Sequence, residues 1–275
     1  MSERIAVTGA TGELGRRVVR LLAERGASLR LVVRDAKRAP QIDDAEIGVA
    51  HYDDESTLFK AFSGMKTIFF VSGHENPRRL ETHLRVVRAA AKAKVERVVY
   101  TSFMGASPGA TFTYARDHAH TEVAIRDAGM QLTALRNALY ADIAPLLVGN
   151  DGVIRGPAGN GSVAWVARED VARLATAVLT DASHANRIYD VSGAAPIDLH
   201  MTAQLLSEVS GREIRYHAET LDEARASRAG NEAWLVEGWV SSYAAIATGD
   251  CGVTSHSVEL VTGKKPWSFA EFLKA

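Results

Sequence analysis

Three glycines near the amino terminus have a spacing that can support chemistry. Gly9, Gly12 and Gly15 lie in the run TGATGELG, between an apolar stretch at residues 4–8 and a segment with apolar residues at helical spacing. The first glycine permits a tight turn, the second lets the backbone approach a ligand, and the third permits close helix packing. Amides at the start of the helix can then bind anionic oxygens. This strand-turn-helix context predicts a pyrophosphate site for a dinucleotide, rather than a purely structural turn.

A basic cluster follows the second apolar stretch, in the run LRLVVRDAKR. At this place an acidic residue usually holds the ribose 2'-hydroxyl of NAD, whereas an arginine can bind the 2'-phosphate of NADP through a bidentate hydrogen bond. Arg34 has this position, and Lys37 and Arg38 are nearby. We therefore expect NADPH as the cofactor in preference to NADH. Asp35 could still bind an NAD ribose, and the cluster could also be a solvated charge run.

Alternating strands and helices must position these residues. Apolar runs predict strands at residues 4–8, 29–33, 46–50, 67–71, 97–101 and 132–135. One of the intervening helices is marked by apolar residues at helical spacing, namely Leu80, Leu84, Val87, Ala91 and Val95. Because parallel strands are joined by right-handed crossovers, the order predicts a Rossmann-type α/β fold with a doubly wound parallel sheet.

The character of the sequence changes after Leu147, where GNDGVIRGPAGNGSVAW is rich in glycine and predicts loops around short extended pieces. A helix at 171–178, a strand in IYDVSG and a helix at 205–209 ended by Gly211 follow. We expect an NADP-binding Rossmann domain at residues 1–150. We assign 151–275 to a mixed segment that partly returns to the sheet and partly forms a smaller C-terminal α/β substrate-side domain.

Composition excludes several classes of protein. Of the 275 residues, 47% are hydrophobic and 24% charged, which is enough apolar material for a large core. The net charge of -1 gives no general attraction to nucleic acid or an anionic membrane. Cys251 is the single cysteine, so no intramolecular disulfide can form. The first residues lack an apolar run typical of a signal peptide or membrane span, and we expect a cytoplasmic protein.

Four stretches together resemble the NmrA-like atypical short-chain dehydrogenases: TGATGELG, the early Arg34, YTSF at 100–103 and LRNALY at 135–140. Within that group the chain is most similar to bacterial NADPH:quinone oxidoreductases of type 2 and to triphenylmethane dye reductases. The likeness continues through IYDVSG and TAQLLSEVSGREI. It implies a reductase that acts on small molecules, and also a homodimer.

The resemblance implies roles for particular residues. The expected pyrophosphate-binding residues are Gly9, Thr11, Gly12, Glu13, Leu14 and Gly15, and Arg34 binds the adenosine phosphate. Residues implied along the cofactor are Ser72, Gly73, Thr101 and Ser102, while Asn137 and Tyr140 are implied near the nicotinamide. The chain departs from the family at His51 and Tyr52, where such proteins often carry an acid beside the adenine.

Most short-chain dehydrogenases use a Tyr-x-x-x-Lys pair, in which the tyrosine donates a proton and the ammonium lowers its pKa. Here the corresponding pair is Tyr114 and His118. A neutral imidazole could bind the ribose or move a proton, but it would not supply a permanent charge. Two interpretations remain open. Tyr114 and His118 act in catalysis together with Asn137, or Tyr114 and His118 have structural roles only. His118 and His120 point in different directions on a helix, and we expect no metal site.

Aromatic and sulfur side chains at expected strand ends could contact a planar acceptor: His74, Phe103, Met104, Tyr140 and Trp165. Core packing is the alternative for each. The favoured function is hydride transfer from NADPH to a quinone-like, conjugated carbonyl or dye acceptor, because this reaction can proceed without a protein acid. Two alternatives remain: a ketone or aldehyde reductase using Tyr114 or His118, and an NADP-binding redox sensor without turnover.

Overall fold

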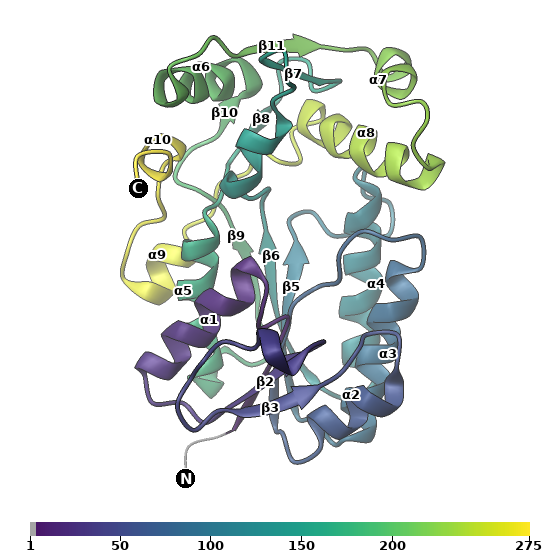
Figure 1. The fold of residues 1–275 in the computed structure, drawn as a ribbon, viewed down its shortest axis with the longest axis vertical. Helices are drawn as coiled ribbons and strands as arrows, with labels where there is room; N and C mark the ends of the chain where they lie inside the picture. The colour runs from purple at the N-terminus through teal and green to yellow at the C-terminus, as the bar shows by residue number, and fades with distance from the viewer. Residues whose placement is uncertain (1–3) are drawn as a thin grey trace. The chain divides into compact units, whose positions relative to one another are not determined.

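The computed structural model describes residues 4–275, and its largest sheet has seven strands in the order β3-β2-β1-β4-β5-β6-β9 (Figure 1). The strands are β1 Ile5–Thr8, β2 Leu29–Val33, β3 Glu46–Val49, β4 Thr67–Phe70, β5 Arg97–Phe103, β6 Gln131–Asn137 and β9 Ile188–Val191. β1 pairs in parallel with β2 and β4, and β2–β3 and β4–β5 are parallel too. The strand order reverses between β1 and β4, which creates the crevice where doubly wound sheets bind ligands.

Helices cover both faces of this sheet (Figure 1). One face carries α1 and α5, and the other carries α2, α3 and α4. Their bounds are α1 Glu13–Glu24, α2 Glu55–Phe62, α3 Arg79–Lys92, α4 Thr113–Asp127 and α5 Arg168–Leu179. Because both faces are covered, β1 and β4 are buried along their whole lengths. The predicted Rossmann-type fold is confirmed.

The helix α3 differs from the prediction at its end and in its buried face. It stops at Lys92, so Val95 lies beyond it, after Lys94, which has a positive φ of 61°. Its buried face includes Arg79 and His83, whereas Leu80 and Leu84 are only partly buried. The predicted helix is confirmed and Val87 is buried, but the buried face also includes these two polar residues.

The chain forms two compact units that alternate along the sequence. The first comprises the residues up to Ser102 together with Asp117–Arg136 and Val171–Tyr189, and the second comprises Phe103–Arg116, Asn137–Asp170 and Asp190–Ala275. The boundary expected near residue 150 stays a prediction.

The second unit contains two small sheets. β7 Val153–Gly156 pairs in parallel with β11 Arg215–Ala218, and β8 Ser162–Val163 pairs antiparallel with β10 Ile197–Asp198. The remaining helices are α6 Leu199–Ser210, α7 Leu221–Ser227, α8 Ala233–Ala247, α9 Ser257–Thr262 and α10 Phe269–Phe272, with 3-10 turns η1 Ala36–Arg38, η2 Ala141–Leu147 and η3 Ala182–His184. Gly211 ends α6 in the left-handed conformation, as predicted. Cys251 is buried in the core of this unit.

Candidate functional site

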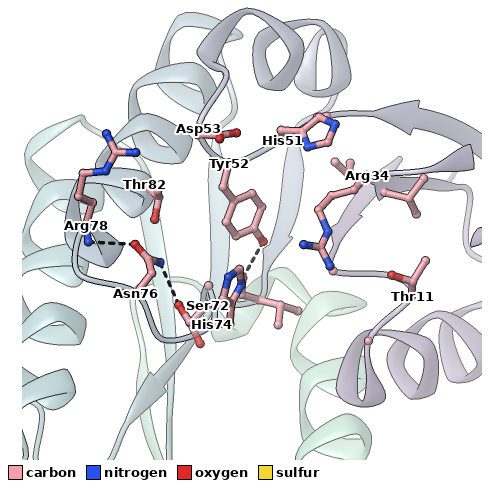
Figure 2. A pocket seen from close by; sticks show the side chains of 17 residues that line it. Thr11, Arg34, His51, Tyr52, Asp53, Ser72, His74, Asn76, Arg78 and Thr82 are labelled. Carbon is pink, nitrogen blue, oxygen red and sulfur yellow. Dashed lines mark hydrogen bonds between the residues drawn. The ribbon is translucent and has the colours of Figure 1, made fainter. Parts of the chain in front are cut away.

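A cavity lies in the first unit where β1, β2, β3 and β4 end, and we name it the switch-point cavity (Figure 2). Figure 2 shows Thr11 and Arg34 on one side of it, Asn76, Arg78 and Thr82 on the other, and Tyr52 between them. Its lining residues are Gly9, Thr11, Gly12, Val32, Val33, Arg34, Ala50, His51, Tyr52, Asp53, Val71, Ser72, Gly73, His74, Asn76, Arg78 and Thr82.

The turn from β1 to α1 forms one wall of the cavity, and its glycines are required by geometry. Gly9 has a φ of +61°, a conformation that other residues rarely adopt. At Gly15 an added Cβ would lie 2.1 Å from the carbonyl oxygen of Gly9, whereas at Gly12 the same contact would be 3.3 Å. Gly12 is the N-cap of α1 and lines the cavity. Amides in a first helical turn lack intrahelical acceptors, so this wall suits an anionic ligand.

Arg34 extends from the end of β2 into the cavity (Figure 2). Its side chain is exposed, and within residues 4–275 its guanidinium forms no ion pair. The neighbouring Asp35 caps the 3-10 turn η1, because its carboxylate accepts the amide hydrogen of Lys37 at 2.9 Å. Arg34 is therefore the charged group from this strand end that lines the cavity.

The segment after β3 supplies His51, Tyr52 and Asp53 to the cavity. The hydroxyl of Tyr52 is 2.6 Å from both Thr8 Oγ1 and the carbonyl oxygen of Val71, so it joins the ends of β1 and β4. Burial raises the pKa of Tyr52. Positions 51 and 52 lack the acid that such proteins often carry beside the adenine, but Asp53, one position further on, lines the cavity and was not expected from the sequence.

The loop from β4 to α3 forms the opposite wall. Ser72, Gly73 and His74, which were expected to contact cofactor or substrate, line the cavity. Within the loop, the Asn76 carboxamide accepts the amide hydrogen of Arg78 at 2.9 Å and donates to the carbonyl oxygen of His74 at 3.1 Å (Figure 2). Side-chain bonds of this kind fix a turn locally. Asn76, Arg78 and Thr82 line the cavity and were not expected from the sequence.

The hydroxyls of Thr101 and Ser102, near the end of β5, form hydrogen bonds within the protein. Thr101 Oγ1 accepts the amide hydrogen of Ser72 at 2.7 Å and thereby supports the cavity wall. Ser102 Oγ donates to the buried Glu122 carboxylate at 2.6 Å, and Arg136 forms an ion pair with that carboxylate at 2.8 Å. Thr101 and Ser102 are themselves absent from the lining of the cavity. Their direct contact with a cofactor stays a prediction, as does that of Glu13, Leu14 and Gly15.

His118 is buried in the first unit, with both ring nitrogens in hydrogen bonds. Arg79 Nη2 donates to its Nε2 at 2.9 Å, so the neutral ring carries its proton on Nδ1, which donates to the Tyr100 hydroxyl at 2.7 Å. Burial, together with the charge on Arg79, holds the pKa of His118 well below its usual range. A neutral imidazole with both nitrogens engaged is poorly suited to donate a proton to a substrate.

Three other predicted residues lie in the second unit. Tyr114 is nearly buried beside α8, where an added Cβ on Gly238 would lie 2.8 Å from its hydroxyl. The Asn137 carboxamide donates to the Tyr140 hydroxyl at 3.1 Å. The Arg168 guanidinium lies 4.6 Å from the centre of the Tyr140 ring, and burial raises the pKa of Tyr140 to about 12. Asn137 and Tyr140 are thus brought together, whereas their catalytic roles and that of Tyr114 stay predictions.

The other residues expected to bind substrate pack within the second unit. Phe103 stacks edge-on against Phe112 at 4.9 Å between ring centres. Met104 is buried, and its amide donates to the carbonyl oxygen of Asn137. Trp165 is 2% exposed and donates to Thr202 in the core of the second unit. Substrate contacts of Phe103, Met104 and Trp165 stay predictions.

Residues 4–275 contain no cluster of three or more metal-ligating side chains. In the same range no helix combines the length and the apolar character that crossing a bilayer requires.

The fold and the glycine-lined switch-point cavity define a Rossmann-type dinucleotide-binding protein. The chain belongs to the NAD(P)H-binding family, which matches residues 9–182. The family and the relatives described next confirm the predicted oxidoreductase class and the resemblance to type 2 quinone oxidoreductases and triphenylmethane dye reductases.

One relative and two solved structures show how far this similarity extends. Quinone oxidoreductase 2 of Escherichia coli is 32% identical over 242 residues, which cover 85% of this chain and 83% of the relative. A solved NADPH-dependent quinone oxidoreductase of E. coli in complex with NADPH has a TM-score of 0.89 and 28% identity, covering 98% of both chains. Triphenylmethane reductase of Citrobacter, solved with NADP(H), has a TM-score of 0.86 and 32% identity, covering 98% of this chain and 99% of the other.

Proposed function

We propose that this protein is an NADPH-dependent reductase that delivers hydride to a quinone-like, conjugated carbonyl or dye acceptor. The observation that carries the cofactor choice is the contrast between two neighbours at the end of β2. Arg34 is exposed in the switch-point cavity, while the carboxylate of Asp35 caps a turn. A guanidinium at this position favours a 2'-phosphate, whereas a free carboxylate would favour an unmodified ribose.

The chain offers the groups that such a cofactor requires. The turn at Gly9 and Gly12, with the start of α1, would hold the pyrophosphate, and Arg34 would hold the 2'-phosphate. Asp53 and His51 lie on the side of the cavity after β3, where they would border the adenosine. NADPH, when bound, supplies a hydride for transfer to the acceptor.

The proposed acceptors fit a site in which His118 is not available as a proton donor. Both nitrogens of His118 are engaged and its pKa is lowered, so a ketone reductase that relies on this residue has less support. A quinone or dye needs less from the protein, because water can protonate the reduced product. The acceptors named in the relatives' descriptions, quinones and triphenylmethane dyes, support the same choice.

Asn137 has a feature that suits a ligand. Its side chain is 2% exposed, and its Oδ1 accepts no hydrogen bond within residues 4–275. A buried acceptor without a donor is costly, so a bound N–H or O–H group would stabilise it. The implied role of Asn137 near a nicotinamide remains part of the proposal, as do the substrate-side role of segment 151–275, the homodimer and a cytoplasmic location.

The proposal can be tested by following NADPH and NADH absorbance with purified protein and a panel of small quinones, conjugated ketones and a triphenylmethane dye. We expect acceptor-dependent oxidation of NADPH. Arg34→Ala should raise the KM for NADPH about 10- to 100-fold, because charge-assisted hydrogen bonds to phosphate contribute about 1.5–3 kcal/mol, while the KM for NADH changes less than about threefold.

Arg212→Ala is the matched control, since it removes an exposed arginine from the second unit. Equal effects of Arg34→Ala on both cofactors would contradict the phosphate site. Tight NADPH binding without oxidation by any acceptor would contradict the reductase and favour the sensor.

A further inference from the structure

The backbone of one residue in the wall of the switch-point cavity is held by two side chains of α3. Gly73 lines the cavity between Ser72 and His74. Its amide hydrogen is donated to Nε2 of His83 at 2.9 Å, and its carbonyl oxygen accepts a hydrogen from Nε of Arg79 at 3.0 Å. Both backbone polar groups of Gly73 therefore depend on two residues that do not line the cavity themselves.

Arg79 is held in place by α4. Its side chain is nearly buried, Nη1 forms an ion pair with Asp117 at 3.3 Å, and Nη2 donates to His118 Nε2 at 2.9 Å. The planar guanidinium thus contacts three groups from two parts of the first unit: the Gly73 carbonyl oxygen in the β4–α3 loop, and Asp117 and His118 on α4. A guanidinium has its donors in a fixed planar geometry, so three partners restrict the conformation of the Arg79 side chain far more than one hydrogen bond would.

His83 is held in the same way. Because Nε2 accepts the Gly73 amide hydrogen, the neutral ring carries its proton on Nδ1, which donates to Thr121 Oγ1 at 3.0 Å. Thr121 in turn donates to the carbonyl oxygen of Asp117 at 2.7 Å. Burial, with Arg79 nearby, keeps the pKa of His83 well below its usual range, so the ring keeps the lone pair that the bond to Gly73 needs.

We infer that Arg79 and His83, supported by His118, are positioning residues that set the Gly73 wall of the switch-point cavity for cofactor binding. This inference rests on the proposed function, because it takes the cavity as the NADPH site. Because these bonds order the β4–α3 loop before NADPH binds, binding does not include the entropic cost of ordering that loop. His118, at the position of the usual lysine, thereby acts on the site through Arg79.

The test compares two replacements of His83. His83→Gln keeps a carbonyl oxygen that can accept the Gly73 amide hydrogen, whereas His83→Phe keeps an aromatic ring and has no acceptor. Hydrogen exchange of peptides spanning residues 72–79 measures the wall without ligand, and calorimetry measures the Kd for NADPH. Leu132→Ala, at a buried position of β6 that is absent from the cavity lining, is the control for general destabilisation.

We expect His83→Phe to speed exchange in residues 72–79 and to raise the Kd for NADPH about tenfold, since a buried donor loses its partner. His83→Gln should restore both to within about twofold of wild type. At saturating NADPH, kcat should stay within about twofold of wild type for either variant. Leu132→Ala should lower the melting temperature without changing the Kd.

Two results would overturn the inference: a Kd of His83→Phe that changes no more than that of Leu132→Ala, or a glutamine variant no better than the phenylalanine variant. A wild-type protein that binds NADPH but reduces no acceptor would overturn the proposed reductase instead. In that case the exchange and Kd measurements still decide the positioning role.

Discussion

The two walls of the switch-point cavity are built in different ways. The turn from β1 to α1 depends on contacts between residues close in sequence, such as the approach of Gly15 to the Gly9 carbonyl. The loop from β4 to α3 depends on Arg79 and His83 and, behind them, on residues of α4. The first wall is set by backbone geometry and the second by a buried polar network, so different perturbations should disrupt them.

The largest effect is expected at the backbone-built wall. Gly15→Ala places a Cβ 2.1 Å from the Gly9 carbonyl oxygen, so the turn and the start of α1 must separate. The free energy of unfolding should fall by about 3 kcal/mol, and the Kd for NADPH should rise at least about tenfold. Denaturant unfolding and calorimetric titration measure the two effects.

Gly12→Ala is the matched comparison, because its Cβ would lie 3.3 Å from the same oxygen. It should cost about 1 kcal/mol of stability while still weakening NADPH binding. Equal losses of stability in the two variants would show that helix packing at position 15 does not govern this wall.

A pH-dependent effect, small near neutral pH, is expected at the network-built wall. Burial lowers the folded-state pKa of His83 and His118 below their unfolded values, so their contribution to stability is complete above about pH 6.5 and is lost as the pH falls below it. The loss can reach about 1.4 kcal/mol per pH unit for each histidine. Arg79 from α3, Tyr100 from β5 and Asp117 from α4 are the other ionisable groups around them.

The free energy of unfolding, measured between pH 7.5 and pH 5, tests this expectation. Hydrogen exchange is measured over the same pH range for residues 72–79 in the network-built wall and for residues 9–15 in the backbone-built wall. Residues 72–79 should lose protection first on acidification. Replacement of His83 by glutamine should flatten the pH dependence, whereas His217→Gln, at an exposed site, should not. A wild-type stability that is constant across this range would exclude neutral histidines as the support of the wall.

The smallest effect is expected from a purely local contact beside the first wall. Asp35→Asn keeps a side chain that can cap η1 and removes a negative charge next to Arg34. The KM for NADPH should fall by about twofold, because exposed charges interact weakly through water, and this gain should shrink in high salt. Steady-state kinetics at two salt concentrations measures it, and an unchanged KM would place the phosphate farther from Asp35.

The part of the site that local geometry determines could be predicted from the sequence. The strand, glycine turn and helix around Gly9, Gly12 and Gly15 were expected, as was Arg34 at the end of β2. Apolar runs identified β1, β2, β4, β5 and β6 because these strands are almost entirely buried, whereas the edge strands β3 and β9 are largely exposed. The short pairs β7–β11 and β8–β10 were not predicted individually, since strands of two to four residues carry little periodicity.

The network behind the second wall was not predicted, because its residues are spread over α3, β5 and α4. His118 was singled out, but as a partner of Tyr114 or the cofactor, whereas its hydrogen bonds lead to Arg79 and Tyr100. One signal was present. His83 lies three residues after Leu80 and four before Val87, so it falls among apolar positions of a helix, where a polar side chain needs a partner.

The burial of Cys251 has a consequence for the chemistry proposed here. Quinones are electrophiles that alkylate thiols, and the thiolate is the nucleophilic form of cysteine. The only cysteine of the chain is 1% exposed, and burial raises its pKa to about 12. Folding therefore keeps this thiol protonated and shielded, so a reactive acceptor could be present throughout turnover without arylating the enzyme at sulfur.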